Sequence, residues 1–436
     1  MKIIIKPKRK DWFDLTNRPL ADVNALNNSV NKVFTDIIKN GDSALKKYSL
    51  FFDKVSLSKF KITEKEINNS SNKIPVKLKK AIQLAKSNIE KFHASQKEQN
   101  NIIETMKGVS CWRESRAIEK VGIYIPGGTA PLFSTVLMLG IPSKLAGCKE
   151  IILCSPPNKD GKINPIILYT ASIVGIKNIF CIGGIQAIGA MTFGTKSIPK
   201  VDKIFGPGNQ YVTAAKQKAQ NYGVAIDLPA GPSEVLIIAD KTCIPSFVAA
   251  DLLSQAEHGS DSQVILLTDN EKISQKIFKE INKQLKELPR KGIVEKALKN
   301  SKSIVLKSIK ECIEFSNLYA PEHLILAVKN ARRFIPEINS AGSVFIGNFS
   351  CESAGDYASG TNHTLPTNGF ARNYSGVSLD SFIKKITFQH LSKKGIQNIG
   401  PAIEIMAEAE QLIAHKNAVT LRLEKIKKSK VIPNKE

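Results

Sequence analysis

The sequence contains few arginines. Of its 63 basic residues only nine are arginine and 54 are lysine, and both types are spread over the whole length. Surfaces that follow a phosphate backbone usually cluster their positive charge and favour arginine. The formal net charge of +24 therefore indicates a lysine-rich solvated surface, and we expect no binding to nucleic acid.

Long apolar runs and paired cysteine motifs are also absent. The apolar stretch APLFSTVLMLGIP is shorter than the ~20 residues that a membrane-spanning helix needs. The opening MKIIIKPKRKDW has only a three-residue apolar run, so it does not have the pattern of a signal peptide. The seven cysteines include no Cys-x-x-Cys pair, which excludes a structural zinc knuckle. We expect a cytoplasmic protein without a membrane partner.

The chain divides into four regions by pattern. Residues 1–108 are polar with apolar positions at helical spacing, and we place His93 there on the surface. In 109–240 and 241–378, short β-branched runs alternate with helical segments, which is typical of parallel α/β layers. Residues 379–436 lack a strand pattern. We therefore predict an α/β fold: two Rossmann-like domains with mainly parallel sheets, plus smaller helical N- and C-terminal appendages.

Eight runs are candidate strands. The first α/β region contributes four of them, at 150–156, 177–184, 202–208 and 234–240. The second contributes another four, at 262–269, 303–309, 323–328 and 342–349.

Three glycine loops follow strands of the first set: IPGGTAP (125–131), CIGGIQAIGA (181–190) and FGPGNQY (205–211). Glycine lets a backbone approach a phosphate, and the N-terminus of the next helix offers free N–H groups, so a dinucleotide fits here. No segment spells G-x-G-x-x-G after a strand with an acid ~20 residues later. Plain tight turns explain the loops equally well.

Four of the six histidines lie in short polar motifs: SQAEHG, PEHL, TNHT and EQLIAH. In SQAEHG, Gln255 and His258 end a segment with helical spacing and can project from one face as a pair of metal ligands. Asp356 and His415 would complete a tetrahedral site of oxygen and nitrogen donors, which zinc or manganese accepts. A helix-capping or surface histidine is the alternative at this motif.

The dipeptide Glu322-His323 follows Ala-Pro and precedes a strand, so both groups could face one cleft. An imidazole can move a proton near neutral pH while a neighbouring carboxylate activates water. A surface glutamate beside a strand-start histidine is the competing interpretation.

Taken together, these motifs resemble the histidinol dehydrogenase family. The resemblance rests on YIPGGTAPLFSTVLM, FGPGNQYV, DLPAGPSEVLIIAD, LLSQAEHG, YAPEHL, SAGDYASGTNHTLPT and EAEQLIAHKNAV, which run in order across nearly the whole chain. It implies oxidation of L-histidinol through L-histidinaldehyde to L-histidine, the last two steps of histidine biosynthesis, with two NAD consumed.

The resemblance also assigns the site. It implies one zinc per subunit, held by Gln255, His258, Asp356 and His415, with His415 supplied by the partner in a homodimer whose active site is shared. The C-terminal region, 379–436, would be the dimerisation appendage. Further positions match family contacts as follows: Ser233, Gln255, His258, His323, Asp356, His363, Glu410 and His415 for the substrate, and Tyr124, Gln186 and Asn209 for NAD.

In the implied mechanism, His323 takes the hydroxyl proton as hydride leaves and Glu322 activates water for the aldehyde step. Zinc orients the substrate. A cysteine nucleophile such as Cys111 or Cys148 is a rival for the second step, but neither has a sequence neighbour placed to lower its pKa. A basic metal-binding protein that has kept the fold without the activity is the alternative from another class.

Overall fold

The structure is a computed structural model and describes residues 1–18, 23–127, 131–229 and 231–431. The chain forms two compact units. The first consists of Met1–Gln96 and Ile118–Phe382, and the second of Lys97–Ala117 and Ile383–Glu436. We describe each unit by itself.

The first unit contains a five-stranded parallel sheet with the order β6-β5-β4-β7-β8. Its strands are β6 (Asn178–Cys181), β5 (Glu150–Ser155), β4 (Lys120–Tyr124), β7 (Lys203–Phe205) and β8 (Ala225–Ile226). The helices α6 (Phe133–Ala146), α7 (Pro165–Val174), α8 (Gly184–Phe193) and α9 (Gln210–Ala219) connect them. Helices from the N-terminal region pack on this layer: α2 (Val23–Asn40), α3 (Asp42–Tyr48), α4 (Glu64–Ser70) and α5 (Val76–Ala94).

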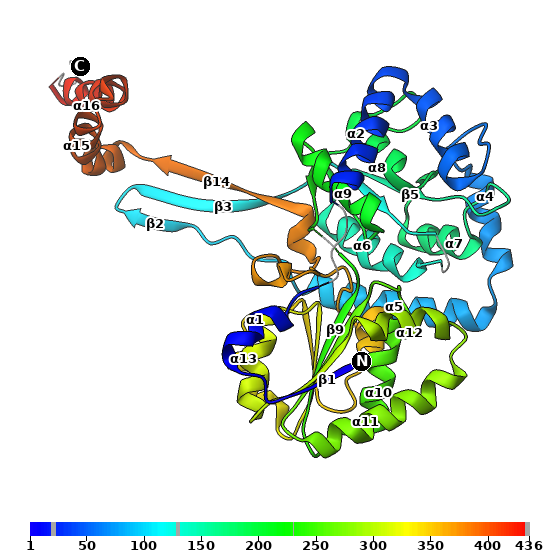
Figure 1. The fold of residues 1–436 in the computed structure, drawn as a ribbon. Helices are drawn as coiled ribbons and strands as arrows, with labels where there is room; N and C mark the ends of the chain where they lie inside the picture. Colours follow the sequence, from blue (N-terminus) through cyan, green and yellow to red (C-terminus); the bar gives the residue numbers. More distant parts are fainter. Residues whose placement is uncertain (19–22, 128–130, 230, 432–436) are drawn as a thin grey trace. The chain divides into compact units, whose positions relative to one another are not determined.

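A six-stranded parallel sheet with the order β1-β11-β10-β9-β12-β13 forms the other half of the first unit (Figure 1). Its strands are β1 (Lys2–Ile5), β11 (Lys302–Val305), β10 (Gln263–Thr268), β9 (Glu234–Ala239), β12 (His323–Ala327) and β13 (Ser343–Ile346). The helices beside it are α1 (Trp12–Leu15), α10 (Pro245–Ala256), α11 (Glu271–Gln284), α12 (Lys291–Lys299) and α13 (Ile309–Tyr319).

Apolar side chains cover both faces of this second sheet. Along β9, Val235 and Ile237 join a core with helices α10 to α12, whereas Leu236 and Ile238 join a core with α13. A parallel sheet buried on both faces needs apolar residues at every position. The continuous run EVLIIA therefore forms a central strand rather than an alternating one.

The second unit has a three-stranded antiparallel sheet and a pair of helices. The strands are β2 (Ile103–Met106), β3 (Val109–Ala117) and β14 (Ile383–Leu391), and the helices are α15 (Lys393–Ala409) and α16 (Ile413–Val431). The turn between the helices uses Gln411 at φ 60°, and the Leu412 N–H donates to the Ala407 carbonyl, which satisfies a backbone acceptor at the end of α15.

The predicted fold class is confirmed, and each of the eight runs proposed as strands includes a strand in the structure. Three details were wrong. The run 234–240 belongs to the second sheet, not the first. The N-terminal region is not wholly helical, because β1 adds to the second sheet beside β11. Residues 383–391 form a strand whose two faces are both largely open to solvent, so no strict apolar alternation marks it. The four-domain division itself stays a prediction.

His93 also differs from expectation, because it is fully buried and not on the surface. Its Nδ1 lies 3.0 Å from the Ile89 carbonyl, one turn earlier in α5, and its Nε2 lies 3.4 Å from Nδ2 of Asn362. Burial lowers the pKa of His93, so it acts as a neutral core side chain. Within the described ranges, no helix combines the length and apolar character needed to cross a membrane.

Candidate active site

Gln255 lies in the last turn of α10 and is 1% exposed. Its Nε2 donates to the Glu234 carbonyl at 3.2 Å and to Oε2 of Glu322 at 3.3 Å. Its Oε1 is buried and has no hydrogen-bond partner in the described chain. His258 is exposed just beyond the helix end, where its N–H donates to the Gln255 carbonyl. The predicted pair therefore lies at one helix end with a free amide oxygen.

Asp356 lies on α14 (Glu352–Tyr357), a short helix that follows β13. One ligand atom from each of His258, Glu352 and Asp356 lies within 4.8 Å of the others. Oδ1 of Asp356 is buried and has no hydrogen-bond partner among the described residues. Glu352 was not among the predicted site residues. It lies four residues before Asp356 and so shares one face of α14 with it. That spacing was the available signal.

Glu322 and His323 lie at the start of β12, after Ala320 at φ 53°. Both are buried, with exposures of 7% and 3%, so the surface interpretation of Glu322 was wrong. Oε2 of Glu322 accepts from the Glu234 N–H at 2.8 Å. Nδ1 of His323 lies 3.1 Å from the Glu234 carbonyl and 3.6 Å from Oε2 of Glu322. Its Nε2 lies 3.4 Å from Oδ1 of Asp356. His323 thus lies between Glu322 and the candidate metal ligand Asp356.

Carboxylates dominate the electrostatics of this place. Burial by itself would lower the pKa of His323, but the Glu322 and Asp356 carboxylates outweigh it and hold that pKa well above its usual value. Burial raises the pKa of Glu352 to about 8 against the opposing effect of His323. The pKa of Asp356 stays below its usual value because His323 offsets the cost of burial. Two buried carboxylates, those of Glu322 and Glu352, and the partly buried carboxylate of Asp356 lie beside one imidazole, an arrangement that favours a bound cation.

The residues present fit a metal ion. Oxygen of an amide, oxygen of a carboxylate and nitrogen of an imidazole are ligands that zinc accepts. Two of these atoms, Oε1 of Gln255 and Oδ1 of Asp356, are buried without a hydrogen-bond partner in the described chain. Buried polar atoms of this kind normally have a partner. His258, Gln255 and Asp356 could therefore serve as three ligands of a metal ion, and Glu352 lies close enough to be a fourth.

His363 and Ser233 lie in the same unit. Nδ1 of His363 is 2.9 Å from the Asp356 carbonyl and its Nε2 is 3.0 Å from Oγ1 of Thr135. Both ring nitrogens therefore have partners in the chain, so the family role of His363 in substrate contact stays a prediction. Ser233 is half-buried directly before β9, and its carbonyl accepts from the Gln263 N–H at 3.2 Å.

The glycine loops follow the carboxyl ends of β4, β6 and β7 in the five-stranded sheet. Residues 128–130 of the first loop lie outside the described residues. The Gly184 N–H donates to Oη of Tyr124 at 3.1 Å, and Nε2 of Gln186 donates to Oδ2 of Asp53 at 3.1 Å. Asn209 caps α9 by accepting from the Val212 N–H. Tyr124 and Gln186 thus both lie at the glycine loop 181–190.

Glu410 and His415 belong to the second unit. Glu410 is the residue after α15, and His415 lies in the first turn of α16. Both are exposed. The structure therefore gathers Gln255, His258 and Asp356 in the first unit, whereas His415 belongs to the second.

Fold and site together define an α/β enzyme that places a buried acid–imidazole pair beside side chains able to bind a metal ion. The family model described as histidinol dehydrogenase matches residues 16–423. The chain is 56% identical to histidinol dehydrogenase of Bacteroides fragilis over 98% of this chain and 100% of that one. It is 52% identical to histidinol dehydrogenase of Pasteurella multocida over 91% and 92% of the two chains. The crystal structure of histidinol dehydrogenase from Elizabethkingia anophelis superposes with a TM-score of 0.96 at 65% identity, covering 98% and 99%.

The chain belongs to the histidinol dehydrogenase family, a family of oxidoreductases. The resemblance predicted from the motifs is confirmed.

Proposed function

We propose that the protein oxidises L-histidinol through L-histidinaldehyde to L-histidine, the last two steps of histidine biosynthesis, with NAD as the electron acceptor and zinc in the site. The proposal depends on the close approach of the proposed base to a proposed zinc ligand. Nδ1 of His323 lies 3.6 Å from Oε2 of Glu322, and its Nε2 lies 3.4 Å from Oδ1 of Asp356. One site can then serve both oxidations.

Gln255, His258 and Asp356 would hold the zinc, together with His415 of the partner subunit. Zinc, when bound, supplies a positive centre that orients the nitrogen atoms and the hydroxyl of histidinol. The unpartnered oxygens of Gln255 and Asp356 support these two assignments. Glu352 is an additional carboxylate next to the ligands, where it either joins them or faces the substrate's ammonium group.

The contacts of His323 support its role as the base. In the neutral imidazole whose proton is on Nδ1, Nδ1 donates to the Glu234 carbonyl at 3.1 Å and the lone pair is on Nε2. A metal cation held beside the Glu322 and Asp356 carboxylates would oppose the rise in the His323 pKa that they cause, so the imidazole would be neutral in the loaded site. Nε2 is buried, without a hydrogen-bond partner in the described chain, and lies on the side of Asp356. Nε2 therefore takes the hydroxyl proton as the carbinol carbon loses hydride.

Glu322 is suited to the second oxidation. Its Oε2 accepts from the Glu234 N–H and from Nε2 of Gln255, and these bonds fix the carboxylate beside the imidazole. The carboxylate removes a proton from water as the water oxygen bonds to the aldehyde carbon. The hydrated aldehyde then loses its second hydride to another NAD, and His323 again takes the hydroxyl proton, which gives the carboxylate product.

Tyr124, Gln186 and Asn209 would bind NAD at the glycine loops. The side chain of Gln186 is fully buried, and its Oε1 has no hydrogen-bond partner among the described residues. The cap formed by Asn209 places the N-terminus of α9 at the end of the FGPGN loop. Free N–H groups at such a position favour a pyrophosphate.

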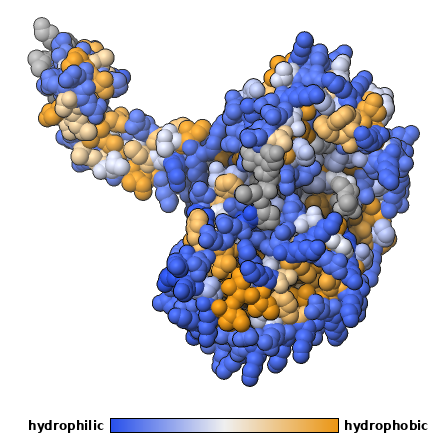
Figure 2. Space-filling model, viewed as in Figure 1, coloured by the Kyte–Doolittle hydropathy of each residue, from blue (hydrophilic) through white to orange (hydrophobic). Residues whose placement is uncertain are grey.

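The second unit supports a homodimer. Large apolar side chains on its helices are exposed, including Ile405 at 69%, Met406 at 64% and Leu421 at 65%. Figure 2 shows apolar colour among the hydrophilic surface of this unit. An exposed apolar surface of this kind is typical of a subunit interface, and a second copy would place Glu410 and His415 in a shared site.

A thiol mechanism is less well supported. Cys148 is buried in the core of the five-stranded layer, and burial raises the pKa of its thiol to about 11. A thiol with so high a pKa is a poor nucleophile near neutral pH. Cys111 lies on β3 of the second unit. Because water activated by Glu322, and not a thiol, would form the bond to the aldehyde carbon, the Cys111→Ala variant is expected to complete the second oxidation.

The stoichiometry of the wild-type reaction tests the proposed function. We expect two NADH for each histidine formed from L-histidinol, with loss of turnover on chelation and recovery on return of zinc. Formation of one NADH per histidinol would contradict the two-step reaction. Salt-sensitive retention on DNA by a folded, zinc-loaded protein without turnover would favour the binding-protein alternative.

A further inference from the structure

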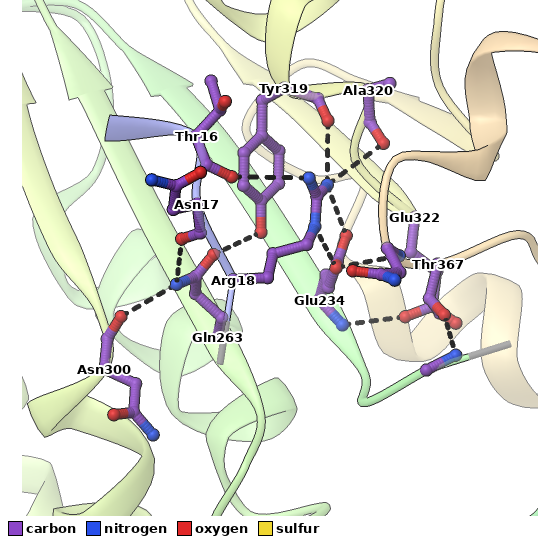
Figure 3. Close-up of polar contacts among 12 residues, drawn as sticks. Thr16, Asn17, Arg18, Glu234, Gln263, Asn300, Tyr319, Ala320, Glu322 and Thr367 are labelled. Carbon is purple, nitrogen blue, oxygen red and sulfur yellow. Dashed lines mark hydrogen bonds and ion pairs between the residues drawn. The ribbon is translucent and has the colours of Figure 1, made fainter. Parts of the chain in front are cut away.

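Arg18 and Glu234 form a buried ion pair beside Glu322 (Figure 3). Nε of Arg18 is 2.5 Å from Oε1 of Glu234, and its Nη2 is 3.0 Å from Oε2. The side chains are 11% and 2% exposed. Glu234 is the first residue of the central strand β9, where the rest of the strand is apolar.

The backbone of Glu234 touches three site residues. Its N–H donates to Oε2 of Glu322, and its carbonyl lies 3.1 Å from Nδ1 of His323 and accepts from Nε2 of Gln255 at 3.2 Å. The orientation of the peptide groups around Glu234 therefore fixes a carboxylate, an imidazole and a proposed zinc ligand together.

Arg18, like Glu234, makes several contacts that fix its side chain. Its guanidinium stacks on the Tyr319 ring, with Cζ 3.8 Å from the ring centroid, and Nη2 donates to the Tyr319 carbonyl at 2.8 Å. Oη of Tyr319 in turn donates to Oε1 of Gln263 at 2.8 Å, and Oε1 of Glu234 also accepts from the Asn368 N–H at 2.9 Å. Tyr319 precedes Glu322 by three residues, so one cation ties the first residue of β9 to the segment before β12.

The stability of the fold does not by itself explain why a charged pair, Arg18 and Glu234, occupies this buried position. A buried ion pair is often no more stabilising than apolar residues of similar volume. A bidentate guanidinium–carboxylate pair does, however, define one geometry, and groups that orient metal ligands and catalytic side chains often have a large effect on activity.

We propose that Arg18 and Glu234 are positioning residues for the catalytic site, and that they hold Glu322, His323 and Gln255 through the backbone of Glu234. This inference rests on the proposed function. Neither residue touches the substrate in the proposed mechanism; their effect passes through the N–H and carbonyl of Glu234. They should therefore affect the rate constant more than the binding of NAD.

The test compares Arg18→Met and Arg18→Lys with a core control, Ile304→Ala. Ile304 is fully buried on β11, which β10 separates from β9, so its truncation lowers the melting temperature without reaching the pair. We expect Arg18→Met to lower kcat by about 10- to 100-fold, with the KM for NAD unchanged within about twofold. Lysine supplies the charge without the bidentate geometry, so Arg18→Lys should recover only part of kcat.

Two further measurements separate positioning from stability. The double variant Arg18→Met/Glu234→Met removes both charges, and we expect its melting temperature to rise toward that of wild type while kcat stays low. Zinc affinity, measured by competition with a chelator, should fall by about 10- to 100-fold in Arg18→Met, a readout that needs no turnover. Wild type without histidinol turnover would defeat the proposed function, while the zinc comparison would still test the pair.

The inference is overturned if folded Arg18→Met keeps kcat and zinc affinity within about twofold of wild type. It is also overturned if Ile304→Ala, at an equal loss of melting temperature, loses as much kcat, or if the double variant regains kcat along with its stability.

Discussion

The most specific prediction concerns Glu322→Gln. The substitution keeps the size of the side chain, and Oε1 of the new amide can still accept from the Glu234 N–H, which lies 2.8 Å from the carboxylate now. The amide cannot take a proton from water. His323 keeps its contact with the Glu234 carbonyl at 3.1 Å. The variant should therefore fold, oxidise the alcohol and fail at hydration of the aldehyde.

The size of the effect follows from the role of the lost group. A positioned general base contributes about 10²- to 10⁴-fold, which is about 2.7–5.4 kcal/mol of activation free energy at 1.36 kcal/mol per tenfold. The aldehyde step should slow by that factor. The alcohol step should slow by less than about tenfold, because Nε2 of His323 remains as its base.

Single-turnover NADH formation from L-histidinol, with an aldehyde-trapping reagent present, separates the two steps. Wild type should form two NADH per histidinol, whereas Glu322→Gln should form one and leave trapped histidinaldehyde. Glu314→Gln is a matched control, because Glu314 pairs with Arg9 in an ion pair whose arginine is largely exposed. Equal slowing of both steps, or two NADH at the wild-type rate, would refute the assignment of Glu322.

Three other predictions follow from charge and exposure. Lys216→Met should cost about 3–5 kcal/mol in urea unfolding, because it strands the buried carboxylate of Asp227, which lies 2.5 Å from Nζ. Burial raises the pKa of Asp53 from 3.8 to about 6, so the folded chain holds this proton more tightly than the unfolded chain and stability falls as pH rises through that window; Asp53→Asn should remove this fall. Ile405→Asp with Leu421→Asp should yield monomers in sedimentation and abolish turnover.

Each of these has a contradicting result. A Lys216→Met variant within about 1 kcal/mol of wild type would mean that water reaches Asp227. Equal pH dependence in wild type and Asp53→Asn would show that another group titrates. Active monomers would exclude a shared site.

The sequence predicted strands well where both faces of a sheet are buried. After their polar first residues, runs such as EVLIIA and QVILLT have consecutive apolar side chains, and such runs are typical of a parallel sheet covered on both faces. The assignment of 234–240 to the wrong sheet has a physical cause: strand order is set by which helices cover each face, and that information is not local. β14 was not predicted because none of its residues, IKKITFQHL, is fully buried. A strand without a buried face does not require alternating apolar and polar residues.

The site was predictable where motifs are dense. Gln255, His258 and Asp356 were proposed as ligands, and the structure brings them together with the Glu322–His323 pair. Arg18 and Glu234 were missed because a lone arginine 216 positions before its partner leaves no local pattern. Glu322 and His323 lie at the amino end of β12, as their place before the predicted strand at 323–328 implied, although ligands of open α/β sheets usually bind at carboxyl ends.

Zinc content and NADH formation from L-histidinol, compared in wild type, His258→Ala and His390→Ala, test whether the proposed zinc ligands and the Glu322–His323 pair carry out the oxidation of histidinol. His390 is exposed on β14, in the second unit, and serves as the control. We predict chelator-sensitive turnover that zinc restores in wild type and His390→Ala, with both zinc and turnover lost in His258→Ala. Full turnover by zinc-free His258→Ala, or none by zinc-loaded wild type, would contradict the account.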